Sequence, residues 1–229
     1  MASFQHSVPT HEANKPAANI NSATARVLDA AGIQTVVADM RRNIDAWLPL
    51  ISSGQVEAIV MNASGCGMTV KEYGHAFAHD SAYAGRAQRV SALTRDLSEL
   101  LPDMVTALLP LLKDKLGTIQ KRQLAFHPPC TLQHGQQLRG GVEKHLNALG
   151  FQVSIASNES HLCCGSAGTY SVLQPKIAYE LRDRKLGNLA QLQPETIVSA
   201  NIGCIQHLQT GTTTPVKHWV EVVDDALRT

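Results

Sequence analysis

The sequence predicts an α/β fold made of two pseudo-repeated cysteine-rich lobes, each a small, mainly parallel sheet covered by helices, with a degenerate first lobe. Segments of strand periodicity alternate with segments of helical periodicity, which is typical of parallel sheets covered by helices. Two pairs of segments in the two halves of the chain resemble each other. Four of the five cysteines also lie in motifs of the second half, each placed where a turn is expected after a strand.

Composition limits the kind of protein. The chain has 229 residues, of which 44% are hydrophobic and 17% charged, enough for one or two domains with an aliphatic core. A formal charge of +1 argues against a nucleic-acid partner, which normally meets a basic surface. There is neither an apolar run of about 18 residues nor a secretory signal in the first twenty. We therefore expect a cytoplasmic protein whose cysteines are reduced or metal-bound.

The internal repeat defines the expected domains. Residues 27–38 parallel 145–156, and 57–66 parallel 195–204, with offsets of 118 and 138 residues. The first copy is thus about 20 residues shorter between its two strands, and it lacks the interval that holds the cysteine pair in the second copy. We predict three parts: a poorly ordered lead-in over 1–18, a degenerate first lobe with a helical linker over 19–118, and a second lobe with the complete cysteine set over 119–229.

Periodicity and turn signals predict the elements of the first lobe and linker in order. They are a helix over 22–31, a strand over 34–38, a helix over 42–51, a strand over 58–62, and helices over 69–78, 82–101 and 104–112.

The second lobe has a more regular alternation. Its predicted elements are a strand over 122–127, a helix over 136–149, a strand over 151–156, a helix over 174–192, a strand over 196–200, a short strand near Val216 and a helix over 219–227. Cys130, Cys163 and Cys204 each follow a predicted strand. Because functional groups gather at the carboxyl ends of parallel strands, one edge of the sheet is expected to collect all three motifs.

These motifs predict a metal site. They are His127-Pro128-Pro129-Cys130, Cys163-Cys164-Gly165 and Gly203-Cys204-Ile205-Gln206-His207. Thiolates bind soft metals, so the predicted ligands are Cys130, Cys163, Cys164 and Cys204, with His207 as a fifth ligand or a hydrogen-bond donor. The spacing differs from the paired CxxC motifs of common zinc domains and from the closely spaced cysteines of ferredoxins. Gly165 and Gly203 are expected to allow close backbone approach or a positive φ angle.

Other interpretations of the cysteines stay open. They could be small buried residues at strand ends, or Cys163 and Cys164 could form a strained, reactive disulfide. Cys66, alone in its lobe, is interpreted as a structural relic. His127, His134 and His161 are more typical of hydrogen-bonded turn residues than of ligands. No catalytic triad, P-loop or GxGxxG motif is present. This favours a protein that carries a redox centre over a self-contained enzyme.

The cysteine pattern resembles the cysteine-rich CCG domain of heterodisulfide-reductase-type iron–sulfur proteins. The wider sequence, over roughly residues 19–229, resembles the iron–sulfur subunits of glycolate oxidase. The segments that carry this resemblance are Phe126–His134, Leu162–Tyr170 and Asn201–Leu208 in the second lobe, and Ala63–Gly67 and Val70–Gly74 in the first.

The resemblance implies a 4Fe–4S cluster held by Cys130, Cys163, Cys164 and Cys204, with zinc as the alternative. It also implies a non-catalytic subunit that accepts electrons from the flavin-containing subunits of glycolate oxidase and passes them toward a membrane acceptor. Such a protein would lie in the cytoplasm, at the inner face of the membrane, through peripheral association with its complex. The alternatives are a zinc-stabilised or metal-free docking module and a thiol redox switch at Cys163 and Cys164.

Three departures from the family pattern are visible. The family's N-terminal ferredoxin-like domain is absent from this sequence, and the first lobe lacks its own first cysteine and CCG segment. His207 also stands where a final CxxC motif would have its second cysteine. We therefore expect a truncated, internally deleted or divergent member of the family.

Overall fold

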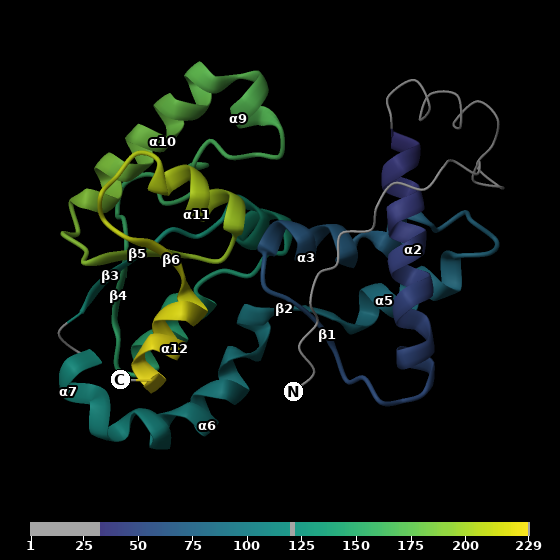
Figure 1. Ribbon diagram of the computed structural model, residues 1–229, viewed down its shortest axis with the longest axis horizontal. Helices are drawn as coiled ribbons and strands as arrows, with labels where there is room; N and C mark the ends of the chain where they lie inside the picture. The colour runs from purple at the N-terminus through teal and green to yellow at the C-terminus, as the bar shows by residue number, and fades with distance from the viewer. Residues whose placement is uncertain (1–32, 120–121, 229) are drawn as a thin grey trace.

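Figure 1 shows the computed structural model, which describes residues 33–119 and 122–228. The predicted lead-in over 1–18 and the helix over 22–31 lie outside these residues. The described part is built around two parallel sheets with helices packed against them, as the α/β prediction requires. None of the described helices has the length and apolar character needed to cross a bilayer.

The larger sheet has four parallel strands in the order β4-β3-β5-β6. They are β3 (Gln123–Phe126), β4 (Gln152–Ile155), β5 (Thr196–Ser199) and β6 (Val216–His218). The chain runs outward from β3 to β4, crosses back to β5 and continues outward to β6. The direction of winding therefore reverses between β3 and β5, and ligand sites of open α/β sheets lie at such a reversal.

Alternating side chains of this sheet point to two separate cores. Leu124, Phe126 and Val198 enter one core, which also contains side chains of α6 (Leu101–Leu112), α8 (Gly141–Ala148) and α12 (Trp219–Arg228). Ala125 and Ile197 enter the other, which contains side chains of α10 (Pro175–Ala190) and α11 (Ile202–Gln209). The sheet is thus covered on both faces (Figure 1), and its strands are apolar toward both.

The smaller sheet pairs β1 (Ile59–Met61) with β2 (Thr94–Asp96) in parallel. Its neighbouring core contains side chains of α2 (Ile33–Ser52) and α5 (Ala84–Leu93) together with residues between β1 and α5. The remaining short elements are α3 (Ser64–Lys71), α4 (Tyr73–Ala76), η1 (Leu97–Leu100), η2 (Lys113–Lys115), α7 (Leu116–Ile119), the π-helical turn η3 (Thr131–Gly135) and α9 (Tyr170–Leu173).

The strand predicted over 34–38 is wrong, because these residues belong to α2. Val37, Met40, Ile44, Trp47 and Ile51 recur every three or four residues and pack into the core of the smaller sheet. That helical period extends through the β-branched segment and overrides its preference for strand. The first arm of the proposed repeat, which paired this segment with β4, therefore differs in structure.

The helix predicted over 82–101 is also wrong in part. It ends at Leu93, and the chain forms β2 and the 3₁₀ turn η1 before α6 begins. Asp96 accepts a hydrogen bond from the Ser98 backbone, while the Glu99 side chain accepts one from the Asp96 backbone. This reciprocal capping box starts a new helical segment and so interrupts the longer helix.

The elements predicted for the second lobe are present in the predicted order, but the helices α9 and α11 were not predicted. In addition, α8 starts at Gly141 and not near residue 136, since η3 and the left-handed Gly140 intervene. The second arm of the repeat is visible in the structure: β1 leads into α3 and β5 leads into α11, and the cysteine is the third residue of each helix. The predicted boundary between residues 118 and 119 stays a prediction.

The two lobes meet at these equivalent turns. The Ser64 backbone N–H donates to the Ala200 carbonyl over 3.0 Å, and the Gly65 N–H donates to Asn201 Oδ1 over 3.2 Å. The hydroxyls of Ser64 and Thr131 are 2.7 Å apart, which ties α3 to the turn after Cys130. The first lobe thus supports two of the three cysteine-bearing segments.

Candidate metal centre

The three cysteine motifs converge where the winding of the larger sheet reverses. Cys130 opens the π-helical turn that follows β3, and the Cys163-Cys164 pair lies in the loop after β4. Cys204 lies in the first turn of α11, just after β5. The prediction that one sheet edge collects these motifs therefore agrees with the strand order.

The four sulfurs form a chain of contacts. Cys130 is hydrogen-bonded to Cys163, Cys163 also to Cys164, and Cys164 to Cys204. Cys164 and Cys204 are buried, whereas Cys130 and Cys163 are partly exposed. The structure accordingly brings together all four predicted cysteine ligands, in a group with a buried inner end and an outer end that reaches the surface.

The ionisation of the four thiols alternates along this chain. Contact with the Cys163 sulfur, together with burial, raises the pKa of Cys130. Hydrogen bonds from Cys130 and Cys164 lower the pKa of Cys163, and Cys164 itself has a raised pKa because its sulfur contacts those of Cys163 and Cys204 and because it is buried. The Cys164 thiol also lowers the pKa of Cys204. Adjacent sulfurs cannot all carry negative charge, so a cation that screens them would allow the remaining thiols to ionise.

Backbone and amide donors stabilise the two thiolates. The Gly165 N–H donates to Cys163 Sγ over 3.3 Å, and Asn201 Nδ2 donates to Cys204 Sγ over 3.7 Å. Hydrogen bonds of this kind fix thiolate ligands in place and tune a bound metal.

Gly165 has the positive φ angle that was expected, +93°. A Cβ atom there would lie 2.2 Å from the Ala178 carbonyl oxygen. Gly203 lies in the first turn of α11 with ordinary helical geometry, and its added Cβ would lie 3.2 Å from Ser166 Oγ. Close approach is therefore seen at both glycines, and a positive φ at Gly165 alone of the two.

The structure does not group His207 with the four cysteines, so its role as a fifth ligand stays a prediction, and the alternative role of hydrogen-bond donor fits its contacts better. Its Nε2 lies 3.1 Å from the Ala178 carbonyl oxygen, and its ring stacks on Tyr179 with centroids 5.8 Å apart. The helical turn from Cys204 to His207 places that ring against α10 instead of the sulfurs. Cys66 is exposed in α3 and lies outside the group, in keeping with its interpretation as a relic.

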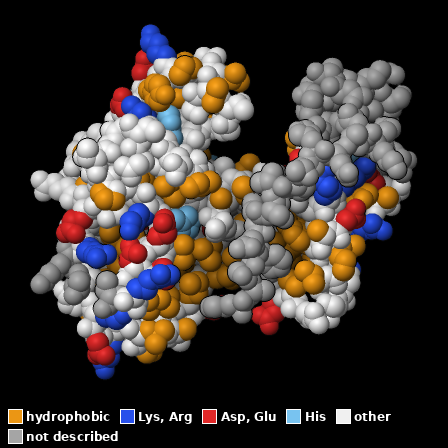
Figure 2. Space-filling view, in the orientation of Figure 1, with side chains coloured by type: hydrophobic (Ala, Val, Ile, Leu, Met, Phe, Trp, Pro, Cys, Tyr) orange, Lys and Arg blue, Asp and Glu red, His pale blue; other side chains and the backbone are white. Residues whose placement is uncertain are grey.

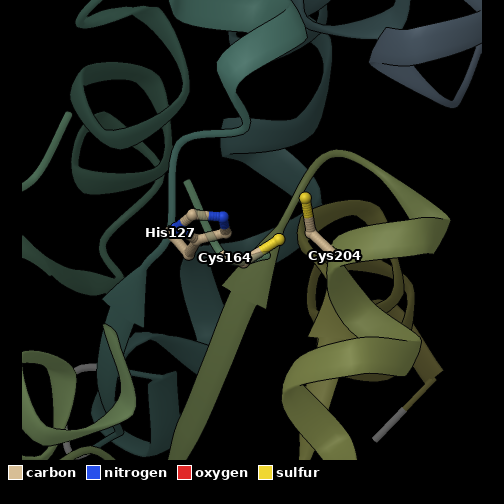
Figure 3. A group of neighbouring side chains, drawn as sticks. All are labelled: His127, Cys164 and Cys204. Atoms are coloured by element: carbon tan, nitrogen blue, oxygen red, sulfur yellow. The ribbon is translucent and has the colours of Figure 1, made fainter. Parts of the chain in front are cut away.

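His127 is the residue that sequence reasoning missed. Its ligand atom and the sulfurs of Cys164 and Cys204 all lie within 4.8 Å of one another (Figure 3), and all three residues are buried. The signal in the sequence was its position directly after the buried apolar residues 124–126 of β3, so that a polar side chain is carried into the reversal point of the sheet.

The donor set fits a 4Fe–4S cluster: four cysteines and a histidine gather in one place, two of the thiols already favour ionisation, and buried ring nitrogens lack partners. Soft thiolate donors are the ligands of iron–sulfur clusters and zinc.

Comparison of the sequence with known proteins identifies the same cysteine-bearing segments. Residues 124–209 match the model of the cysteine-rich domain family, CCG. The match begins in β3 and ends with α11, so it includes all three cysteine motifs.

The chain as a whole is similar to the glycolate oxidase iron–sulfur subunit of Escherichia coli K12, with 46% identity over 91% of this chain and 54% of that protein. It is 28% identical to lactate utilization protein A of Anoxybacillus flavithermus, over 66% of this chain and 61% of that protein. The corresponding protein of Geobacillus kaustophilus is 26% identical over 66% and 60%. The resemblance predicted from the motifs is confirmed, and the chain spans between half and two thirds of the lengths of these relatives.

Proposed function

We propose that this chain is an electron-transfer component of a glycolate-oxidising complex, with one cysteine-ligated 4Fe–4S centre in its CCG domain. The observation that carries the proposal is the convergence of Cys130, Cys163, Cys164 and Cys204 at the reversal point of the sheet. The similarity to an iron–sulfur subunit of glycolate oxidase supports the reaction class. In this proposal electrons come from flavin-containing partner subunits and leave toward a membrane acceptor, and the chain associates with the cytoplasmic face of the membrane only through its complex.

The arrangement of the site suits outer-sphere electron transfer. A bound iron–sulfur cluster would supply one-electron chemistry. Cys164 and Cys204 would hold its inner side away from water, while the partly exposed Cys130 and Cys163 would bring its outer side near the protein surface. The Gly165 and Asn201 donors would tune its potential through the sulfurs.

Exposed apolar side chains lie on α9, which follows the cysteine pair in the chain, and at the start of α11, which carries Cys204, and they support docking of a partner. Val172 and Leu173 on α9 are 78% and 70% exposed, and Ile202 at the start of α11 is 56% exposed. Figure 2 shows hydrophobic side chains gathered around α9 and the start of α10. Exposed apolar surface of this kind is typical of interaction sites.

The deciding experiment is metal and sulfide analysis of the anaerobically purified chain, with an absorption spectrum. We expect about four iron and four sulfide per chain and a broad band near about 400 nm, as in 4Fe–4S proteins. Cys163→Ser should lose the centre, whereas Cys66→Ser, with its exposed side chain outside the group, should keep it. Full iron content in Cys163→Ser would sink the ligand assignment.

A second candidate function is a zinc-stabilised docking module, favoured by the compact His127–Cys164–Cys204 group. Three donor atoms at such short separations can bind a single metal ion. About one zinc per chain and a colourless protein would support this candidate. A metal-free protein in which Cys163 and Cys164 are reversibly oxidised would support the thiol switch instead.

A further inference from the structure

The backbone of His127 is fixed at the reversal point of the larger sheet. Its N–H donates to the Val198 carbonyl over 2.8 Å, and its carbonyl accepts a hydrogen bond from Ser199 Oγ over 2.9 Å. Both partners belong to β5, the strand that leads to Cys204. The imidazole therefore has a defined position relative to the cysteine-bearing turn that follows β5.

The side chain of His127 is fully buried, at 0% exposure, and neither ring nitrogen has a nitrogen or oxygen partner among the described residues. The ring interacts instead with the sulfur of Cys204. Native proteins leave few buried polar groups unsatisfied. The imidazole therefore lacks any partner other than sulfur in the described part of the chain.

A metal centre would supply that partner. A ring nitrogen of His127 faces the sulfurs of Cys164 and Cys204 (Figure 3), and the three ligand atoms lie within 4.8 Å of one another. Imidazole nitrogen and thiolate sulfur bind zinc at about 2.0–2.3 Å, so two donors on one ion lie no more than about 4.6 Å apart. Only a small adjustment separates the observed spacing from coordination.

We propose that His127 is a direct ligand of the centre. Its ring nitrogen forms an inner, buried donor set with Cys164 and Cys204, and Cys130 and Cys163 complete the site on the outer side. This inference rests on the proposed function, because it takes the four-cysteine site to hold a metal centre. In this proposal the fifth ligand is His127 and not His207. The His207 ring lies against the Ala178 carbonyl and stacks on Tyr179.

The test is pulsed electron paramagnetic resonance on the full chain, purified anaerobically with ¹⁵N-labelled histidine and reduced to its paramagnetic state. We expect a strong ¹⁵N coupling from a directly bound imidazole. It should vanish in His127→Gln and persist in His207→Gln and His134→Gln. His134 is a suitable control because it is exposed and lies four residues after Cys130.

A wild-type cluster without a bound-nitrogen coupling overturns the inference while leaving the proposed function intact, as does a coupling that survives in His127→Gln. Absence of any cluster contradicts the electron-transfer proposal itself. If His127→Gln fails to fold, the wild-type spectrum still decides. If the protein holds zinc, X-ray absorption decides: a nitrogen shell at about 2.0–2.1 Å beside sulfur at about 2.3 Å supports the ligand, and sulfur alone refutes it.

Discussion

At the residue scale, Lys185 is a buried ammonium group beside the cysteines. Its side chain is 1% exposed, and Nζ donates to the carbonyls of Glu159 at 2.6 Å and Ser160 at 3.2 Å. Those carbonyls belong to the loop that leads to Cys163. Burial lowers the pKa of Lys185, while electrostatic interaction with the nearby cysteine group and with Glu159 raises it. Lys185 thus fixes the loop that leads to Cys163, and its positive charge offsets the negative charge of the cysteine group.

Lys185→Met should lower the free energy of unfolding by about 2–3 kcal/mol, because two carbonyls lose a charged donor. It should also make the potential of a bound centre more negative, because a nearby positive charge is lost. Denaturant unfolding and a redox titration measure the two effects. Arg184→Met is the matched control: Arg184 pairs with the Glu159 carboxylate but is 63% exposed, so its loss should cost less than about 1 kcal/mol. Equal effects of the two changes would contradict the role of Lys185.

The special roles of Lys185 and His127 depend on tertiary burial, which sequence patterns report poorly. The many charged residues of α10 are typical of a solvated helix. Yet Ala178, Lys185, Leu186 and Leu189 lie on one buried stripe of this helix, and that spacing is visible in the sequence. The four cysteines were predictable because their motifs are rare and follow strands. His127 was not, since a histidine next to proline is common in turns.

At the element scale, the loop after β4 that carries Cys163, Cys164 and Gly165 depends on the left-handed conformation of Gly165. Its φ of +93° disfavours any side chain, and the Ala178 carbonyl that an added Cβ would strike is also the contact of His207. The loop, α10 and α11 are therefore held together at one point next to Cys164.

Gly165→Ala should destabilise the protein by more than about 2 kcal/mol, from backbone strain and the clash with Ala178. Gly187→Ala is the control, because Gly187 lies within α10 and an added Cβ meets no atom within 4 Å. That change should stabilise by about 0.5–1 kcal/mol, as expected for glycine in a helix interior. Thermal unfolding of both variants tests the pair, and an unaffected Gly165→Ala would disprove the constraint.

Two irregular elements, one in each lobe, show why parts of the chain were predicted less well. The capping box of Asp96 and Glu99 was present in the sequence as a start signal, but the surrounding helical period masked it. The π-helical turn η3 has no comparable local signature, since its Gln136 N–H to Thr131 carbonyl bond depends on packing against α3. Elements fixed by local periodicity were thus predictable, and those fixed by the contact between lobes were not.

At the scale of the whole molecule, Gln136 links the lobes. Its Nε2 donates to the Ser64 carbonyl at 2.9 Å and to Asp96 Oδ2 at 3.1 Å. Asp96 is buried, at 2% exposure. Through this side chain, α3 and β2 support the turn that carries Cys130, which gives the first lobe a structural role although it has no cysteine group of its own among the described residues.

Gln136→Leu should lower stability by about 1–3 kcal/mol, because a carbonyl and a buried carboxylate lose their donor. Amide hydrogen exchange should accelerate in both α3 and η3, and iron should be lost faster to a chelator. Gln191→Leu, at an exposed position after α10, is the control and should change neither quantity. Faster exchange in only one of the two segments would mean that the lobes are not coupled through Gln136.

The uneven burial of the donors also bears on damage by oxygen. Cys130 and Cys163 are within reach of solvent, whereas His127, Cys164 and Cys204 are not. Oxidants should therefore attack the outer thiolates first, because oxidation follows exposure and thiolate character. The three inner donors would survive and could still hold a single zinc ion. Aerobic handling would then turn a brown electron carrier into a colourless zinc protein. Zinc in such a preparation would indicate loss of the cluster by oxidation and not the metal that the protein normally binds.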